Sequence, residues 1–437
     1  MTMKVGMISL GCAKNLVDSE MILGMLESGG AEIVAKPEAA DLILINTCGF
    51  IQSAKEEAIR TIFDMIPYRT RSKRIIVLGC LSQRYQQDLS VEIPEVDRFV
   101  RLDEYGRLGE IIQEVMGIST EKSLFPAMDF SHRLLSTPPH WAYVRIADGC
   151  DNCCTYCAIP LIRGSFHSRR ITDIYEETKK LVQEGRKEIV LIAQDTTAFG
   201  KENGETLSDL LRVLSPLKGL AVLRVLYLYP HEVNEELIET FASLPNVAPY
   251  FDLPIQHADN HVLRRMNRRD TQEGLRHLLQ SIRQRIPHAI LRTTVMVGFP
   301  GETEQEFQNL LSFLKEMEFD RLGAFVYSPE EGTVAANFQD DVSTDEKQRR
   351  YQKVMRLQQT ISSRRLRQQI GTEHEVMIEG YDSRLKQYRS RSYAFAGDQT
   401  DGWIYVNPVR EFNLGESLRV RIIGSYLYDL IAEVIEI

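Results

Sequence analysis

The chain has 437 residues, of which 43% are hydrophobic and 26% are charged. This is the composition of a globular protein of two to four domains, and it excludes a disordered, a collagen-like or a small disulfide-rich protein. The formal net charge of -9 is uneven: residues 1–130 carry 14 Lys and Arg against 19 Asp and Glu, residues 372–437 carry 7 against 11, and the part between is neutral.

The sequence contains no apolar stretch long enough to predict a transmembrane helix, which needs about 18 residues or more. The apolar run Val5–Leu10 is also too short for the core of a signal peptide. We therefore expect a cytoplasmic protein that makes no use of a membrane. In a reducing cytosol, its seven cysteines are expected to be metal ligands, catalytic groups or buried thiols rather than disulfides.

Residues 1–120 are predicted to form a doubly wound parallel-sheet domain. Continuous apolar runs, typical of strands buried on both faces, alternate with helical patterns. One helix is expected to begin at a capping box, Ser53 to Glu56, and to stop at Pro67. The predicted strands are Lys4–Leu10, Asp41–Asn46 and Arg74–Gly79.

Residues 121–140, rich in Ser, Thr and Pro, are predicted to be a linker. Residues 141–370 are predicted to form a partial (βα)6 barrel with its function at the carboxyl ends of the strands. Helical segments such as Ile174–Glu184 and Glu304–Met317 separate the strands, and a long basic helix, Asp345–Ile370, follows them. The predicted strands are Ala142–Ala147, Glu188–Ala193, Val222–Tyr229, Tyr250–Leu253, Ala289–Val297 and Gly323–Tyr327.

Residues 371–437 are predicted to form a small closed barrel of five antiparallel strands, because short apolar segments alternate there with Gly, Asp and Asn. The predicted strands are His374–Ile378, Arg389–Phe395, Gly402–Val406, Ser417–Ile423 and Leu427–Ile435.

Four of the seven cysteines crowd into the segment after the first barrel strand. Cys150, Cys154 and Cys157 form a C-x3-C-x2-C pattern, which can hold three irons of a [4Fe–4S] cluster and leave the fourth open to an external ligand. A zinc site is the alternative interpretation, but zinc ribbons separate their cysteine pairs by about 15–20 residues. Adjacent Cys153 and Cys154 would also have difficulty reaching one ion together, so we favour the cluster.

The other three cysteines each follow a predicted strand of the first domain: Cys12, Cys48 and Cys80. Loops that follow neighbouring strands of an open parallel sheet meet at its carboxyl edge. Taken singly, each of these cysteines is best interpreted as a buried core residue. For all three together, placed beyond rather than inside their strands, we favour a second metal site, and soft ligands again indicate an Fe–S cluster.

The C-x3-C-x2-C pattern, with an aromatic residue before its last cysteine and a barrel after it, resembles the radical S-adenosylmethionine superfamily. The resemblance implies that Cys150, Cys154 and Cys157 bind a cluster whose open iron holds S-adenosylmethionine, and that Tyr156 lies near the adenine. Val295-Met-Val-Gly-Phe-Pro-Gly-Glu302 is similar to the adenine-side segment of that superfamily, which implies that Gly298 and Glu302 contribute to cofactor binding. Cys153 departs from the usual pattern.

The part of the barrel where ligands are expected carries further polar residues. Gln194 and Asp195 follow the second barrel strand, and His257 lies in Leu-Pro-Ile-Gln-His. We expect these positions to contact ligand, with Gln194 assigned to the cofactor. The alternative, hydrogen bonding within the loops, is equally compatible with the sequence.

The layout of the whole chain resembles the radical S-adenosylmethionine methylthiotransferases, which join an N-terminal cluster domain, a radical S-adenosylmethionine barrel and a C-terminal TRAM barrel. This resemblance implies two [4Fe–4S] clusters and two S-adenosylmethionine molecules, one giving the methyl group and one the radical that abstracts hydrogen. It also implies a sulfur source and a one-electron donor, with the N-terminal cluster, or sulfide on its open iron, as the acceptor and donor of sulfur. No catalytic residue is predicted beyond the six cluster cysteines.

Two branches of this family fit, one that modifies adenosine in transfer RNA and the RimO branch, which modifies the β-carbon of an aspartate in ribosomal protein S-twelve. Three segments resemble the RimO branch: Ser9–Glu20, Asn46–Ile51 and Ile192–Thr197. The acidic C-terminal domain is unfavourable for RNA but suits a basic ribosomal protein, so transfer RNA is the less favoured substrate. A metal-binding or RNA-binding scaffold without catalysis is the alternative of a different class.

Overall fold

The computed structural model describes residues 2–119, 123–397 and 401–436. The chain divides into two compact units, and each is built from separate stretches of sequence. Unit 1 comprises residues 1–136, 148–167 and 328–336, and unit 2 comprises residues 137–147, 168–327 and 337–437. Residues 121 and 122 of the predicted linker lie outside the described residues.

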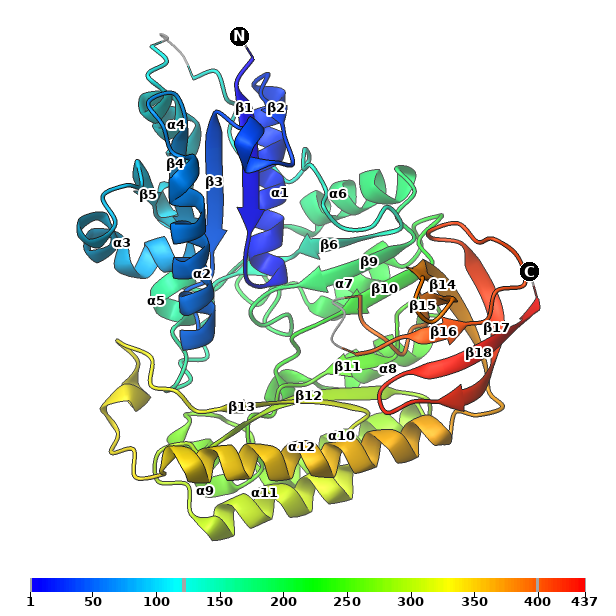
Figure 1. Cartoon of the computed structure of the whole chain (residues 1–437). Coiled ribbons are helices and arrows are strands. Elements are labelled where there is room, and N and C mark those ends of the chain that lie inside the picture. Colours follow the sequence, from blue (N-terminus) through cyan, green and yellow to red (C-terminus); the bar gives the residue numbers. More distant parts are fainter. Residues whose placement is uncertain (1, 120–122, 398–400, 437) are drawn as a thin grey trace. The chain divides into compact units, whose positions relative to one another are not determined.

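The centre of unit 1 is a five-stranded parallel sheet in the order β2-β1-β3-β4-β5 (Figure 1). The three strands predicted from continuous apolar runs are present as β1, β3 and β4, and short edge strands flank them. The bounds are β1 Lys4–Ser9, β2 Glu32–Ile33, β3 Leu42–Thr47, β4 Arg74–Gly79 and β5 Arg98–Val100.

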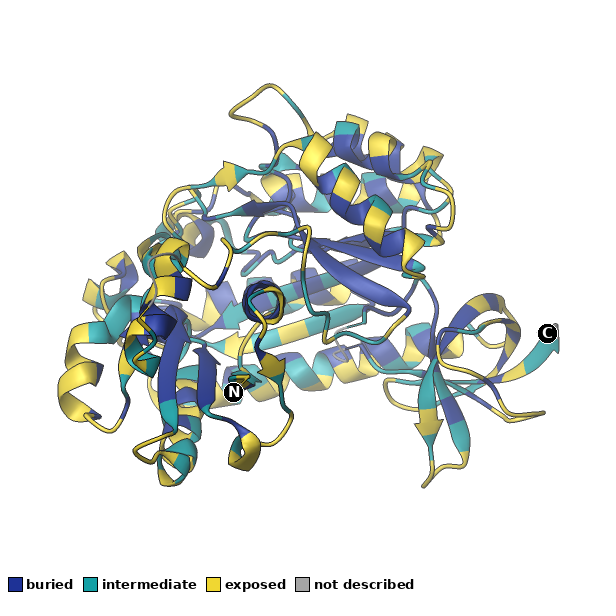
Figure 2. Cartoon of the chain, turned by 90° about the horizontal axis from the view of Figure 1, so that it is seen from above, coloured by how far each residue is buried: buried dark blue, intermediate teal, exposed yellow. Residues whose placement is uncertain are grey.

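Helices cover both faces of this sheet, as a doubly wound domain requires. Along β3, Leu42 and Leu44 pack against α1 and α4, whereas Ile43 and Ile45 pack against α2 and α3. Figure 2 shows the strands largely buried and the helices exposed on one side. The bounds are α1 Ala13–Ser28, α2 Gln52–Met65, α3 Cys80–Glu92, α4 Leu108–Met116 and α5 Ile159–Arg163, with 3-10 turns η1 Pro37–Ala39, η2 Ile66–Tyr68 and η3 Leu102–Arg107.

The predicted capping box at Ser53 is wrong. Helix α2 begins two residues earlier, with Ile51 instead of Ser53 as its N-cap and no capping side chain, so Ser53 lies inside the first turn. Glu56 instead accepts a hydrogen bond from the side chain of Gln52 at 2.9 Å. This contact is an ordinary pairing of residues four apart on a helix surface.

Unit 2 holds six parallel barrel strands in two sheets of three, ordered β10-β9-β6 and β11-β12-β13 (Figure 1). Their bounds are β6 Trp141–Arg145, β9 Glu188–Ile192, β10 Val222–Val225, β11 Tyr250–Asp252, β12 Ile290–Val297 and β13 Arg321–Val326. The predicted strand Val222–Tyr229 extends too far, because Tyr227 has a left-handed backbone with φ 63° that ends the ladder. Two short strands, β7 Ala147–Asp148 and β8 His167–Ser168, lie where the chain passes between the units.

Helices follow the barrel strands in sequence. Their bounds are α6 Ile171–Gln183, α7 Leu207–Leu214, α8 Glu235–Ser243, α9 Asn260–Arg265, α10 Gln272–Arg285, α11 Glu304–Met317 and α12 Thr344–Arg367, with 3-10 turns η4 Pro230–Glu232 and η5 Val334–Asn337. The long basic helix predicted from the sequence is α12, which packs against β13 and α11 (Figure 1). None of the helices in the described ranges is long and apolar enough to cross a membrane.

The C-terminal strands close into a barrel in the order β14-β15-β16-β18-β17. The prediction of a small five-stranded barrel is confirmed, but its strands are not all antiparallel, because β16 and β18 pair in parallel. The parallel pair arises because β17 lies between them in sequence. The bounds are β14 Glu373–Asp382, β15 Gln387–Arg391, β16 Ile404–Val406, β17 Ser417–Ser425 and β18 Leu430–Glu436.

A buried network of charged side chains joins this barrel to the central strands of unit 2. Glu188 at the start of β9 accepts hydrogen bonds from Arg224 at 2.8 Å and from Arg391 at 2.9 Å. Arg391 also pairs with Glu379, whose carboxylate lies 2.9 Å from His140. Charges this deeply buried have to be paired, so the network links the two sheets at one relative position.

Candidate functional site

The three cysteines of the N-terminal domain lie at the carboxyl ends of neighbouring strands. Cys12 is the N-cap of α1, Cys48 directly follows β3, and Cys80 is the first residue of α3, directly after β4. Since β1, β3 and β4 are adjacent in the sheet, the three loops share one edge. Cys12 is exposed, Cys48 is half-buried and Cys80 is buried.

The loops that carry these cysteines are packed so closely that glycine is required beside them. A Cβ atom added at Gly11, where φ is 92°, would lie 2.8 Å from Cβ and 3.4 Å from Sγ of Cys48. A Cβ atom at Gly49 would lie 2.7 Å from the carbonyl oxygen of Cys80. Each glycine precedes or follows one cysteine and leaves room for the loop of another, so the local sequence brings the three thiols to one place.

Asn15, fully buried in the first turn of α1, connects the three loops by hydrogen bonds. Its Nδ2 donates to the carbonyl oxygens of Leu10 at 3.2 Å and Thr47 at 3.0 Å, one residue before Cys48. Its Oδ1 accepts from the thiol of Cys80 at 3.3 Å. A single buried amide thereby holds the loops after β1, β3 and β4 together.

Burial raises the pKa of the Cys80 thiol to about 12, and the charges of the neighbouring Cys12 and Cys48 add to this rise while that of Arg163 opposes it. Burial also raises the pKa of Cys48. The three thiols therefore influence one another electrostatically. Because a thiol must lose its proton to bind a metal, metal binding here would release protons.

The segment with the other four cysteines lies between β7 and α5, and it belongs to unit 1. Its fold is held by backbone hydrogen bonds from Cys150 to Gly164 at 3.2 Å and from Cys157 to Cys154 at 3.0 Å. Two N–H groups point to sulfur: the amide of Ile159 to Cys157 and the side chain of Asn152 to Cys150, each at 3.5 Å.

Tyr156 and Cys153 differ in their placement on this segment. Tyr156 is half-buried, whereas Cys153 is exposed and has a left-handed backbone with φ 51°. Non-glycine residues adopt that conformation only where their surroundings impose it. The strained position falls on the one cysteine that belongs to neither triad.

Among the residues that the structure describes, no group of three or more His, Cys, Asp or Glu side chains is already arranged as metal ligands. The donor chemistry nevertheless fits an Fe–S cluster at both places. One triad has three thiols in closely packed loops with glycine beside them, and the other has three half-buried thiols with N–H donors facing sulfur. Soft thiolates in a shell of N–H donors are typical of Fe–S sites.

Gly298 and Glu302, predicted to bind cofactor, form one buried turn after β12 in unit 2. The Glu302 carboxylate accepts hydrogen bonds from the amides of Gly298 and Phe299, the latter at 3.2 Å. The same carboxylate lies 3.2 Å from the Arg350 guanidinium and 3.4 Å from Nε2 of His257. A Cβ at Gly298 would lie 2.3 Å from the Lys347 side chain, so glycine is required there. These contacts hold the shape of the turn.

The polar residues expected at the strand ends of unit 2 contact their own loops, and His257 also lies beside Glu302 of the turn after β12. Asp195 accepts hydrogen bonds from the amide of Thr197 at 3.0 Å and from that of Ala198 at 3.3 Å. His257 is fully buried and its Nδ1 accepts from the amide of Asp259 at 3.0 Å. For Asp195 and His257 the structure favours loop hydrogen bonding. Gln194 is half-buried just beyond β9.

Sequence reasoning missed Asn15, Tyr227 and Gln256. Asn15 could have been recognised as a polar residue one turn after Cys12, in a helix that is buried along most of its length. Tyr227 and Gln256 have left-handed backbones, with φ 63° and 64°, just beyond β10 and β11. Strained backbone at strand ends is typical of ligand sites, but no residue type marks it in a sequence.

Three segments match known families: residues 4–101 match the Uncharacterized protein family UPF0004, residues 144–314 the Radical SAM superfamily and residues 370–435 the TRAM domain. The chain is 46% identical to the ribosomal protein uS12 methylthiotransferase RimO of Caldicellulosiruptor saccharolyticus, over 99% of this chain and 100% of that protein. The corresponding protein of Geobacter sulfurreducens is 45% identical, over 99% and 98%. The chain belongs to the RimO family. Both the predicted family and the predicted enzyme class, a radical S-adenosylmethionine methylthiotransferase, are confirmed.

Solved structures share the fold of this RimO-family chain at low sequence identity. The radical S-adenosylmethionine methyltransferase TsrM from Kitasatospora setae superposes with a TM-score of 0.55 and 13% identity, over 75% of each chain. The cobalamin-dependent S-adenosylmethionine radical enzyme OxsB superposes with a TM-score of 0.52 and 12% identity, over 82% of this chain and 56% of that one. At this sequence identity, the structural similarity shows only that the folds are alike.

Proposed function

We propose that the chain inserts a methylthio group at the β-carbon of an aspartate of ribosomal protein uS12. In this proposal it uses two S-adenosylmethionine molecules and two [4Fe–4S] clusters, together with a sulfur source and a one-electron donor. Cys150, Cys154 and Cys157 hold the cluster that binds S-adenosylmethionine. The N-terminal triad holds the cluster that handles sulfur.

The observation that carries the proposal is the membership of all six cysteines in one compact unit. The two segments are far apart in sequence, yet both belong to unit 1. A reaction that breaks a C–H bond at one centre and delivers sulfur from another needs both centres on the same rigid body. A scaffold with one structural metal has no such need.

The residues of the chain have separate tasks in this scheme. The half-buried ring of Tyr156 is suited to cover the adenine. In unit 2, Glu302 fixes the turn at Gly298, and the family resemblance assigns both residues to cofactor binding. When bound, the cluster and S-adenosylmethionine supply one-electron chemistry that breaks an unactivated C–H bond.

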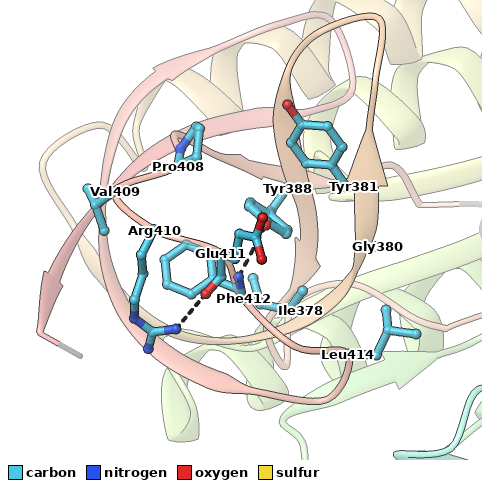
Figure 3. Close-up of a pocket in the computed structure, with 10 residues that line it drawn as sticks. All are labelled: Ile378, Gly380, Tyr381, Tyr388, Pro408, Val409, Arg410, Glu411, Phe412 and Leu414. Atoms are coloured by element: carbon cyan, nitrogen blue, oxygen red, sulfur yellow. Dashed lines mark hydrogen bonds between the residues drawn. The ribbon is translucent and has the colours of Figure 1, made fainter.

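The C-terminal barrel supports a basic protein as the substrate. Residues 372–437 carry 7 Lys and Arg against 11 Asp and Glu, which repels the phosphates of RNA. The barrel has an open pocket of ≈ 780 Å³ with the rings of Tyr381, Tyr388 and Phe412 and the carboxylate of Glu411 (Figure 3). The exposed ring of Tyr381 beside a carboxylate suits a Lys or Arg side chain, whereas Arg410 of the same pocket already lies 4.6 Å from the Phe412 ring and is paired with Glu416.

Mass spectrometry of each substrate tests the proposed reaction. Enzyme reconstituted with iron and sulfide is incubated with S-adenosylmethionine, sulfide and a reductant, together with either uS12 or transfer RNA. We expect the mass gain of one methylthio group in place of hydrogen on one aspartate of uS12. Modified transfer RNA with unmodified uS12 would overturn the proposed substrate, and the absence of 5′-deoxyadenosine would favour a scaffold without catalysis.

Iron analysis tests the two clusters separately. Replacing Cys150, Cys154 and Cys157 by Ala is expected to leave about four irons per chain on the N-terminal triad. Cys153→Ala is the matched control from the same segment, because this exposed cysteine belongs to neither triad, and we expect it to retain about eight irons. An iron-free triple variant contradicts the second cluster, and loss of iron from Cys153→Ala contradicts the ligand assignment.

A further inference from the structure

Arg163, the last residue of α5, buries its guanidinium among groups of the N-terminal domain. Its side chain is 5% exposed. Nη2 donates to Asp18 at 2.7 Å and to Asn15 Oδ1 at 2.8 Å, and Nη1 donates to Asp148 at 3.3 Å. Nη2 also lies 3.8 Å from Sγ of Cys80, within hydrogen-bond range for sulfur. Arg163 therefore extends from the segment of one cysteine triad to a ligand of the other.

The position of Arg163 is fixed by packing as well as by charge. Ala158 and Ile162 of the same short segment form a buried cluster with Cys80. An arginine that only neutralised the two carboxylates could take several positions beside them. Arg163 instead lies where its Nη2 is 3.8 Å from Sγ of Cys80, the buried cysteine of the N-terminal triad.

If Cys80 is a cluster ligand, its contact with Arg163 affects the hydrogen bonding and the charge around its sulfur atom. A ligated thiolate accepts hydrogen bonds and cannot donate one. Asn15 presents its oxygen to Cys80 and so offers no donor to a thiolate. Arg163 then supplies an N–H group near the sulfur and a positive charge that it shares with the carboxylates of Asp18 and Asp148. Hydrogen bonds and positive charge near cluster sulfur favour the reduced cluster, because reduction adds negative charge.

We infer that Arg163 is a positioning residue that holds Cys80 as a ligand and raises the reduction potential of the N-terminal cluster. This inference rests on the proposed second cluster. It also means that the segment after Cys157 adjusts the electron affinity of the other centre, so that the two centres are linked by a side chain of the protein.

The test uses the variant that lacks Cys150, Cys154 and Cys157, so that any cluster signal comes from the N-terminal triad. Arg163→Gln and Arg163→Lys are added separately, with Arg170→Gln as the control. Arg170 is the exposed N-cap residue of α6 in unit 2, where it pairs with Asp173. Bound iron is counted, and the midpoint potential is measured by a redox titration followed by electron paramagnetic resonance.

We expect Arg163→Gln to shift the midpoint potential to a more negative value, Arg163→Lys to recover part of the shift, and Arg170→Gln to leave it unchanged. An unchanged midpoint in Arg163→Gln with full iron overturns this inference alone. Equal iron loss in Arg163→Gln and Arg163→Lys, with equal loss of thermal stability, also overturns it, since that result indicates a structural role. An iron-free parent variant overturns the proposed second cluster and this inference with it.

Discussion

Replacement of Glu188 by glutamine is expected to weaken the attachment of the C-terminal barrel to the central strands. Glu188 is 3% exposed and receives hydrogen bonds from Arg224 and Arg391, which are 1% and 2% exposed. Glutamine keeps the length and shape of the side chain but removes the charge that both guanidiniums face. Arg391 then still faces Glu379, whereas Arg224 loses this carboxylate partner. A buried charge without its partner strongly destabilises a folded protein.

The size of the effect follows from the pKa of Glu188. Burial alone would raise this pKa, but the charges of Arg391 and Arg224 outweigh burial and lower it from 4.5 to about 2. A shift of this size corresponds to about 3 kcal/mol. Because the pKa is lower in the folded state, the stabilisation is fully present above pH 4.5 and is lost as the pH falls toward 2.

Tryptophan fluorescence provides the assay, because both tryptophans of the chain lie in unit 2. Trp141 is in β6, 5.9 Å from the Arg391 guanidinium, and Trp403 is in the C-terminal barrel. In urea unfolding at pH 7, we expect Glu188→Gln to lose about 3 kcal/mol of the free energy of unfolding. We expect the gap to wild type to narrow below pH 4.5.

The matched control is Glu375→Gln, which removes an exposed carboxylate from β14 of the same barrel. We expect this variant to stay within about 0.5 kcal/mol of wild type. If Glu188→Gln also stays within that margin at pH 7, or if its gap to wild type is the same at pH 3 as at pH 7, the reasoning from the buried network is wrong.

Three further variants test other contacts. Gly11→Ala places a Cβ atom 2.8 Å from the Cβ atom of Cys48, so we expect the reconstituted variant to lose about four of about eight irons. Gly30→Ala is the control, because Gly30 has a similar φ of 85° but lies in open space, and we expect this variant to keep its iron. Arg84→Met removes a buried partner 2.9 Å from Glu330, and we expect faster limited proteolysis within residues 328–336, with fragments identified by mass spectrometry. Glu302→Gln is expected to destabilise unit 2 by roughly 1–3 kcal/mol and to weaken binding of S-adenosylmethionine in equilibrium dialysis, whereas unchanged binding would exclude a role for the turn.

The features that could be predicted from the sequence are those set by local pattern. Continuous apolar runs marked β1, β3 and β4, and Cys48 and Cys80 directly follow two of them. The expectation that the N-terminal loops meet at one edge follows from the general geometry of parallel sheets. The closed C-terminal barrel could be predicted because its strands are short, regular and separated by turn residues.

The features that could not be predicted depend on contacts between distant residues. Arg163 looks like any arginine at the end of a helix, and only the fold places it beside Cys80. The left-handed backbone of Tyr227 is imposed by its surroundings, which include the Asp252 carboxylate that accepts its amide hydrogen at 2.9 Å. The start of α2 differs from the prediction because the helix begins after Ile51 without a capping side chain, so no residue type marks the boundary in the sequence.

The assembly of unit 1 from three stretches of chain has a consequence for its synthesis. Residues 328–336 complete the unit, with Glu330 pairing to Lys55 and Arg84, and with the amide of Ala335 donating to Thr155 beside Cys154. These residues leave the ribosome about 190 residues after the N-terminal stretch ends, which takes roughly 10–40 s at ordinary translation rates. During that interval the cysteine thiols that have already been synthesised lack the contacts that residues 328–336 later make within unit 1. The nascent chain is therefore expected to be most vulnerable to oxidation before residue 336 emerges.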